Sequence, residues 1–272
     1  MIQLSYSSSN LVLNCQQKYV HYKVDKVDKD SDFVDSNALK IGSAFHKCLE
    51  DTKHVLKGFT PANLKLVVED HELDFEEHGP LLFAMLAKYK DLHEASGLVC
   101  DRVETKLDDK NLLGYVDVHM IDEKSGELWI TDVKTAANIS GSLKKRLSQD
   151  RQLNLYVSRS LDCGPIAGSK MRVVSKPKLK RKADEKFGAY FKRLYKSCKA
   201  HEYTVRREDM EPEKAYEDHV DLAKIARSLH KGKKPTRNYS FCESFFRPCE
   251  YWSKCHGGRE FSDETKIELL EV

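Results

Sequence analysis

GYVDVHMIDEKSGELWITDVKT, residues 114 to 135, is the stretch of sequence that decides the fold. It contains most of two apolar strands, Leu112 to Ile121 and Leu128 to Val133, joined by the turn DEKSG at residues 122–126. Gly126 supplies the one residue type that adopts positive φ freely in such a tight turn. We therefore expect a β-hairpin at the centre of the molecule.

Three charged residues interrupt this apolar hairpin. Asp117 lies inside the first strand, and Asp132 and Lys134 lie at the end of the second. Residues two apart on a strand share a face, so Asp132 and Lys134 point the same way, and hairpin pairing brings Asp117 beside them. Such a group is most often a solvated surface pair of small energetic value. If the group is buried, a divalent cation would offset the cost of burying two carboxylates and an ammonium.

The composition restricts the class of protein. A chain of 272 residues suits one large domain or two small ones, and its 33% of charged residues exceeds the usual level of about 25%. The sequence has neither a membrane-spanning apolar run nor the apolar core of a signal peptide. We therefore expect an intracellular, cytoplasmic protein (in the host cytoplasm if it is viral) with no membrane partner. In that reducing compartment, eight cysteines favour metal or cofactor ligation over disulfides.

Positive charge is concentrated between Lys170 and Lys199, where twelve Lys or Arg accompany only two acids. The local balance is +10, so the rest of the chain sums to −7 of the total of +3. A charge run is usually a solvated face, but this one suits a phosphate backbone. We expect the interleaved Tyr190, Phe191 and Tyr195 to stack unpaired bases. The candidate DNA-binding residues are Lys176, Lys178, Lys180, Arg181 and Lys182.

Near the end of the chain, CESFFRPCEYWSKC places Cys242, Cys249 and Cys255 in the spacing C-x6-C-x5-C. Three cysteines this close together indicate metal ligation, and thiolates select zinc or iron–sulfur. Zinc ribbons usually use paired C-x-x-C knuckles, which this stretch lacks. A Cys₄ site requires a fourth ligand. Both metals remain open on these residues alone.

Two helices carry further polar candidates. A helix predicted from about Asn37 to Lys57 places His46 next to its apolar stripe, and another, from about Leu143 to Ser160, places Gln152 and Tyr156 on one face. Alone, each is an ordinary surface or packing pattern. Other expected helices cover 61–70, 80–95, 183–200 and 212–229, and other strands 98–106, 171–174 and 202–207, with 231–238 as an irregular linker.

Taken in order, these motifs resemble the PD-(D/E)XK nucleases. In particular they resemble the RecB-like exonuclease branch with an iron–sulfur cluster, which includes AddB, the CRISPR-associated exonucleases and phage relatives. The matching residues are Gly42 and His46, then Gly114, Asp117, Asp132, Lys134 and Thr135, then Gln152 and Tyr156. The resemblance implies an α/β, restriction-endonuclease-like core. Its mixed central sheet would be flanked by helices, and a metal cluster would join the N- and C-terminal ends of the chain.

The resemblance also implies roles for individual residues. Catalysis falls to Asp117, Asp132, Lys134, Gln152 and Tyr156, and the ligands of Mg²⁺ or Mn²⁺ are His46, Asp117, Asp132 and the carbonyl of Val133. Cys15, Cys242, Cys249 and Cys255 would hold a [4Fe–4S] cluster, with zinc as the alternative. The chain departs from the family at Gln16, where proline is usual, and in the wide spacing between Cys242 and Cys249. Glu104 would be an additional carboxylate near the site.

As a whole the chain is expected to be a single nuclease domain over 1–272. The catalytic core would span 36–160 with a helical insertion at about 60–96, followed by the basic segment 170–200, and Cys15 would join 236–256 in the cluster region. The expected function is a metal-dependent DNA exonuclease acting on ends or single strands in recombination, repair or DNA processing, with a helicase, recombinase or polymerase as partner. A structure- or site-specific endonuclease and a non-catalytic nucleic-acid-binding module are the alternatives.

Overall fold

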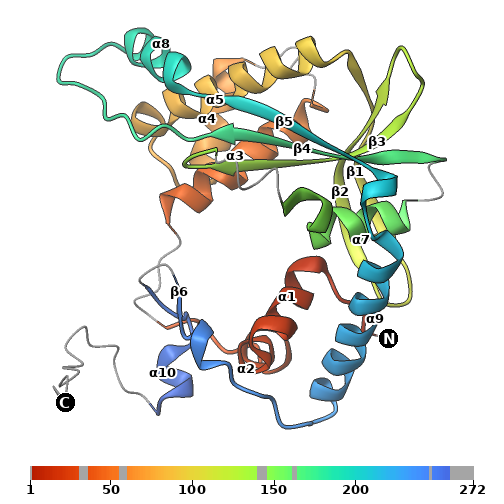
Figure 1. The fold of residues 1–272 in the computed structure, drawn as a ribbon. Helices are drawn as coiled ribbons and strands as arrows, with labels where there is room; N and C mark the ends of the chain where they lie inside the picture. The colour runs from red at the N-terminus through yellow and green to blue at the C-terminus, as the bar shows by residue number, and fades with distance from the viewer. Residues whose placement is uncertain are drawn as a thin grey trace, which may run out of the picture. The chain divides into compact units, whose positions relative to one another are not determined.

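The computed structural model describes residues 2–30, 36–54, 60–139, 146–160, 164–244 and 247–257 (Figure 1). The chain forms two compact units, one made of residues 1–34 and 221–272 and the other of residues 35–220. The boundary falls within one long helix, α9 (Pro212–His230).

A five-stranded sheet is the centre of the larger unit. Its strands are β1 (Leu98–Asp108), β2 (Leu113–Asp122), β3 (Leu128–Ala136), β4 (Ile166–Ser175) and β5 (Ala200–Arg206), in that spatial order. All neighbouring pairs are antiparallel except β3 and β4, so the sheet is mixed. The predicted hairpin is present as β2 and β3, and Gly126 in its turn has a φ of +72°.

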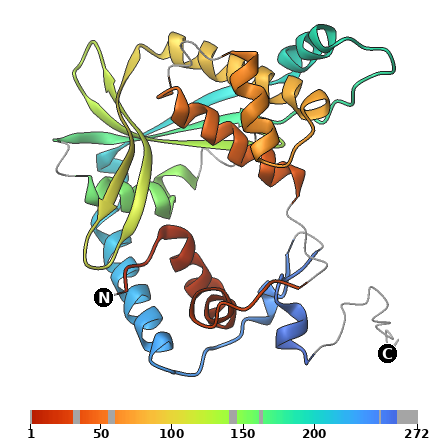
Figure 2. The ribbon, with the colours of Figure 1, turned by 180° about the vertical axis from the view of Figure 1, so that it is seen from behind.

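Helices cover both faces of this sheet (Figures 1 and 2). One face carries α3 (Asn37–Asp51), α4 (Pro61–Asp70) and α5 (Phe75–Ser96), and α7 (Arg151–Arg159) lies on the other. The helix α8 (Phe187–Ser197) packs against α5. Local chemistry fixes the start of α7, because the Asp150 carboxylate accepts a hydrogen bond from Leu153 N at 3.0 Å.

The hydrophobic core explains which face of β3 carries charge. Val133 of β3 and Val174 of β4 are buried against Phe45 and Leu49 of α3. Because side chains alternate along a strand, Asp132 and Lys134 must then point to the opposite face, toward α7. The core therefore sets the orientation of the candidate site.

A buried polar network joins the sheet to α5. The Arg172 side chain is 0% exposed and its guanidinium donates to Glu202 Oε2 at 2.8 Å and Ser96 Oγ at 2.9 Å. It also lies 3.0 Å from His93 Nδ1. These partners offset the cost of burying the charge, so Arg172 holds β4, β5 and α5 together.

His54 should make stability depend on pH. It is 2% exposed, its Nδ1 lies 2.9 Å from the Tyr89 hydroxyl, and burial lowers its pKa to about 3. Because this pKa lies below that of an unfolded histidine, near 6.5, the contribution to stability is complete above pH 6.5 and is lost as the pH falls toward 3. Between pH 7 and pH 5 the loss should reach about 2 kcal/mol. Urea unfolding at pH 7 and at pH 5 should show that the free energy of unfolding changes less between the two pH values in His54→Gln than in the wild type. The exposed His201→Gln is the control, and an unchanged difference in His54→Gln would contradict this account.

The smaller unit is helical at its core. It contains α1 (Tyr6–Asn14), α2 (Gln16–Tyr19), a π-helix at Val20–Val24 and the second half of α9. Its buried apolar residues include Leu4, Val12, Tyr19, Ala226 and Leu229. A two-stranded ribbon, β6 (Glu243–Ser244) with β7 (Arg247–Pro248), and α10 (Trp252–Cys255) complete it. None of the helices described in either unit is long and apolar enough to cross a membrane.

Candidate functional site

Asp117 stands where β2 and β3 stop pairing. The register between these strands runs from Ile121–Leu128 to Val118–Thr131. At the next position the Asp117 carboxylate accepts a hydrogen bond from Val133 N at 2.9 Å. The side chain thus takes the place of a backbone partner, and this holds its carboxylate against β3.

Asp132, Lys134, Gln152 and Tyr156 form one hydrogen-bonded chain from β3 to α7. Lys134 Nζ donates to Asp132 Oδ1 at 2.9 Å and to Gln152 Oε1 at 3.0 Å. Gln152 Nε2 in turn donates to the Tyr156 hydroxyl at 3.2 Å. The spacing of four residues places Gln152 and Tyr156 on one helical face, as predicted.

The Asp132 carboxylate is only partly neutralised. The residue is 1% exposed, and its Oδ2 is buried without a hydrogen-bond partner among the described residues. Burial raises its pKa to about 7, the nearby Asp117 carboxylate acts in the same direction, and the Lys134 ammonium opposes both. Burial also raises the pKa of Asp117. Two buried acids with one unpartnered oxygen are costly alone and chemically suited to a hard divalent cation.

His46 lies at the edge of this acid pair. Its Nδ1 is 3.9 Å from Asp117 Oδ2, and burial, together with the Lys134 charge, lowers its pKa. The imidazole is therefore neutral at pH 7, the form that ligates metals. Within the described ranges, no three His, Cys, Asp or Glu side chains are already arranged to hold a metal ion.

The glycines of the motif permit close packing around the site. A Cβ on Gly42 would lie 3.2 Å from Thr135 Oγ1, so glycine lets α3 approach the end of β3. A Cβ on Gly114 would lie 3.4 Å from Tyr156 Cε1. The sequence matched both glycines to a pattern. The structure gives a steric reason for Gly42, whereas the 3.4 Å approach at Gly114 is an ordinary van der Waals contact.

Enlarging Gly42 should displace His46 from the site. Gly42→Val forces α3 away from Thr135, and overpacking of this kind costs about 1–3 kcal/mol. We expect the activity of the site to fall about tenfold or more, since a misplacement of about 1 Å can cost as much as 10²-fold. Gly188→Val in α8 is the matched control, because a Cβ there meets nothing within 4 Å. Equal activity in the two variants would contradict this role for Gly42.

Glu104 has an unusual backbone beside Asp117. It lies between the paired positions Val103–Val118 and Thr105–Val116, opposite Asp117, and its φ is +46°. Although the residue is exposed at the surface, desolvation by the surrounding protein and the neighbouring Asp117 carboxylate raise its pKa to about 7. Positive φ at a non-glycine residue inside a strand is strained, a feature that concentrates at functional sites. Sequence reasoning placed Glu104 near the site without any sign of this strain.

Of the candidate DNA-binding residues, Lys176 lies near α3 and acts on His46. Its Nζ donates to Ala38 O at 2.8 Å, it contributes to the lowered pKa of His46, and burial lowers its own pKa. Lys178, Lys180 and Lys182 are exposed in the connection between β4 and α8. Arg181 is also exposed but pairs with Glu76 at 3.2 Å.

The expectation that the aromatic residues of this segment stack bases is wrong for Tyr190. It is 5% exposed, packs against Ala84 and Leu194, and donates its hydroxyl to Leu179 O at 2.6 Å. Phe191 and Tyr195 pack against the same cluster. These rings attach α8 to α5, which is a structural task.

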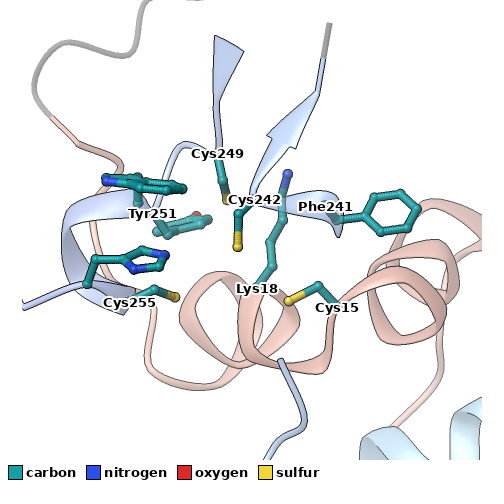
Figure 3. Close-up of a pocket in the computed structure, with 9 residues that line it drawn as sticks. Cys15, Lys18, Phe241, Cys242, Cys249, Tyr251 and Cys255 are labelled. Atoms are coloured by element: carbon teal, nitrogen blue, oxygen red, sulfur yellow. The ribbon is translucent and has the colours of Figure 1, made fainter. Parts of the chain in front are cut away.

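The smaller unit contains a pocket lined by all four predicted cluster cysteines (Figure 3). The sulfur atoms of Cys15, Cys242, Cys249 and Cys255 point toward a common space. They come from the α1–α2 junction and from segment 242–255, and each is a free thiol. Burial raises the pKa of Cys242 and Cys255, and that of Cys249 to about 11.

Several neighbours of this pocket were not anticipated from sequence. His21 Nε2 lies 3.5 Å from Cys255 Sγ, and Lys18 and His256 line the pocket. His256 stacks on Trp252 with ring centroids 4.0 Å apart. Of the remaining cysteines, Cys48 and Cys198 are buried in the core and Cys100 is partly buried, while Cys163 lies outside the described residues.

The chain is similar to one known protein family and to several solved structures. The sequence model of the PD-(D/E)XK nuclease superfamily matches residues 3–256. Among solved structures, a candidate exonuclease from Eubacterium rectale has 11% identity and a TM-score of 0.46, covering 97% of this chain and 91% of its own. The protein SSO0001 has 12% identity and a TM-score of 0.32, covering 84% and 90%. No curated protein matches the sequence.

The family match confirms the predicted fold class, an α/β core with a mixed five-stranded sheet flanked by helices. It also makes nucleic acid the class of substrate. Because the match extends over nearly the whole chain, this protein belongs to the PD-(D/E)XK nuclease superfamily.

Proposed function

We propose that this nuclease is a metal-dependent DNA exonuclease of the RecB-like branch, acting on DNA ends or single strands. The observation that supports it most strongly is the buried, unpartnered Oδ2 of Asp132 beside Asp117. A fold does not keep two raised-pKa carboxylates at the end of a strand without a compensating charge. A scaffold that had lost its activity would have no reason to retain this cost.

The residues that would hold the cation are Asp117, Asp132 and the Val133 carbonyl, with His46 as an additional ligand. Oxygen ligands suit Mg²⁺, and a neutral imidazole favours Mn²⁺. When bound, the cation would polarise the scissile phosphate and lower the pKa of water. Glu104, opposite Asp117, would supply a further carboxylate on the same side.

Lys134 supplies the positive charge for the transition state. Its ammonium donates hydrogen bonds to Asp132 and Gln152, which orient it at the site. In that position it orients the attacking water and offsets negative charge developing on the phosphate. Gln152, bonded to Tyr156, holds the lysine in place. Lys176 and its exposed neighbours bind the phosphate backbone of the DNA strand.

We further propose that Cys15, Cys242, Cys249 and Cys255 hold a [4Fe–4S] cluster, with zinc as the alternative. Four thiols around one pocket match the ligand set of such a cluster. It would tie the start of the chain to its C-terminal segment within the smaller unit. The raised thiol pKa values require a positive centre before the cysteines act as thiolates.

Digestion of end-labelled linear DNA, in parallel with covalently closed circles, tests this function. We expect single nucleotides or short products from linear substrate with Mg²⁺ or Mn²⁺, none with a chelator, and intact circles. Lys134→Ala should lose this cleavage. Lys124→Ala, which removes an exposed lysine of the same hairpin, is the control and should keep it. Cleaved circles would indicate an endonuclease, and binding without any cleavage would indicate a non-catalytic module.

A further inference from the structure

The segment 231–241, KGKKPTRNYSF, joins α9 to Cys242, and sequence reading treated most of it as a linker. It contains four Lys or Arg and no Asp or Glu. The absence of acids extends over residues 222–242, which contain six Lys or Arg. This second concentration of charge, which we name the basic–aromatic segment, lies in the smaller unit and away in sequence from Lys170 to Lys199.

The backbone of the basic–aromatic segment is fixed in place. It leaves α9 through Gly232, whose φ is +89°, and Lys233 N donates to Ser228 O at 3.0 Å. Further along, Thr236 O accepts a hydrogen bond from Gln17 N at 3.1 Å. Arg237 donates to Cys255 O at 2.9 Å. A segment held in this way has little backbone conformational entropy left to lose on binding.

Its side chains are turned to solvent. Lys231, Lys233 and Lys234 are exposed, and no ion pair with them occurs among the described residues. Tyr239 is 69% exposed and Phe241 is 41% exposed. In Figure 3 the ring of Phe241 points away from the sulfur atoms of the pocket. This is the opposite of Tyr190 and Tyr195, whose rings pack inward onto α5.

The ordinary explanation covers only part of this pattern. A lysine after the last turn of α9 interacts favourably with the helix dipole, which accounts for Lys231. The helix dipole does not explain why the aromatic ring of Tyr239 is 69% exposed. Leaving a large apolar ring in water does not stabilise the free protein. An acidic peptide would explain the cations but not the ring.

We propose that the basic–aromatic segment is a second binding site for single-stranded DNA. The three lysines contact successive phosphates, and Tyr239, with Phe241, stacks unpaired bases. Single strands offer both a chain of anions and free π-faces, which is the combination this segment matches. The proposal rests on DNA being the substrate, and it assigns to the smaller unit a role in holding the strand.

Fluorescence anisotropy with a labelled oligothymidylate of about 15 nucleotides, in a chelator that prevents cleavage, tests the site. Lys231→Gln/Lys233→Gln/Lys234→Gln should weaken binding about tenfold and reduce the salt slope by about 2, at roughly 0.7 per phosphate contact. Tyr239→Ala should weaken binding about tenfold, and Tyr239→Phe should restore it. Lys65→Gln/Lys90→Gln/Lys124→Gln removes the same charge from exposed positions of the larger unit and is the control.

Each outcome decides the matter. Unchanged affinity in both segment variants overturns the site, and so does an equal loss in the control triple. If the segment variants lose binding to anionic vesicles but keep their affinity for DNA, the segment binds a membrane surface and the DNA site is overturned. If the wild type digests DNA while the segment variants bind normally, only this inference fails. If the wild type neither binds nor digests DNA, the proposed function fails with it.

Discussion

Asp132→Asn is expected to abolish DNA cleavage and at the same time to stabilise the folded protein. Asp132 is 1% exposed, and burial raises its pKa to about 7. This folded-state pKa lies above the value near 3.9 of an unfolded aspartate, so the carboxyl favours folding below pH 4 and this contribution is lost as the pH rises through about 7. At pH 8 asparagine avoids the cost in stability of burying an ionised carboxylate.

The expected gain in the free energy of unfolding at pH 8 is about 1–3 kcal/mol, because loss of the Lys134 ion pair offsets part of it. Cleavage should fall about 10³-fold or more, since a ligand of the cation is removed. Urea unfolding at pH 8 and at pH 4 and digestion rates at pH 8 measure both effects. The gain should vanish near pH 4.

Asp101→Asn, which changes an exposed carboxylate on β1, is the control and should change neither the free energy of unfolding nor the digestion rate. A variant that keeps a tenth of the wild-type rate would rule out the role of Asp132.

The second large effect concerns the cysteine pocket. Serine in place of Cys15 should remove the iron and the brown colour of anaerobically purified protein, together with its absorption near about 400 nm. Cys15 and Cys255 are 240 residues apart in sequence, so a shared metal closes a long loop in addition to filling the pocket. Because binding occurs mainly in the folded state, its free energy adds to stability, and the variant should unfold at a lower temperature.

Cys249→Ser should behave as Cys15→Ser does, and Cys100→Ser, which removes a partly buried thiol of β1, should keep the colour. Since burial raises the pKa of Cys249 to about 11, metal loading must release protons and should be tighter at pH 8 than at pH 6. Metal analysis separates the outcomes. Iron and sulfide support the cluster, and stoichiometric zinc in colourless protein supports the alternative. Protein that contains neither iron nor zinc would contradict a metal site in this pocket.

The central hairpin could be predicted from sequence because its signals are local. Two apolar runs and the glycine in the turn between them predicted β2 and β3, and Gly126 has the positive φ that this turn requires. The helix after Asn37 was also predictable, but its end was placed six residues too late. It ends at Asp51 because Lys53 and His54 adopt positive φ, and His54 turns inward to Tyr89.

Other features depended on contacts between distant parts of the chain. The start of α7 lies later than expected because the Asp150 side chain caps it. The aromatic residues of α8 were mistaken for exposed ones, since sequence does not show that α5 covers them. The buried Arg172 network joins β4, β5 and α5 and left no local pattern.

The candidate site was predictable as a set of residues but not as an arrangement. Motif order nominated Asp117, Asp132, Lys134 and Gln152, and the structure brings them together through hydrogen bonds. The Asp117 carboxylate bonds to the Val133 amide because β2 and β3 stop pairing at this point, and Glu104 has its positive φ on the neighbouring strand β1. Such separation is a tertiary property.

The most direct measurement of the central claim is anomalous diffraction from crystals soaked in Mn²⁺ at a concentration that supports cleavage. A strong peak in contact with carboxylate oxygens of both Asp117 and Asp132 is the predicted result, and it should be lost in Asp132→Asn. Density that shows the two carboxylates without an ion between them, in protein that cleaves DNA under the same conditions, would contradict the account.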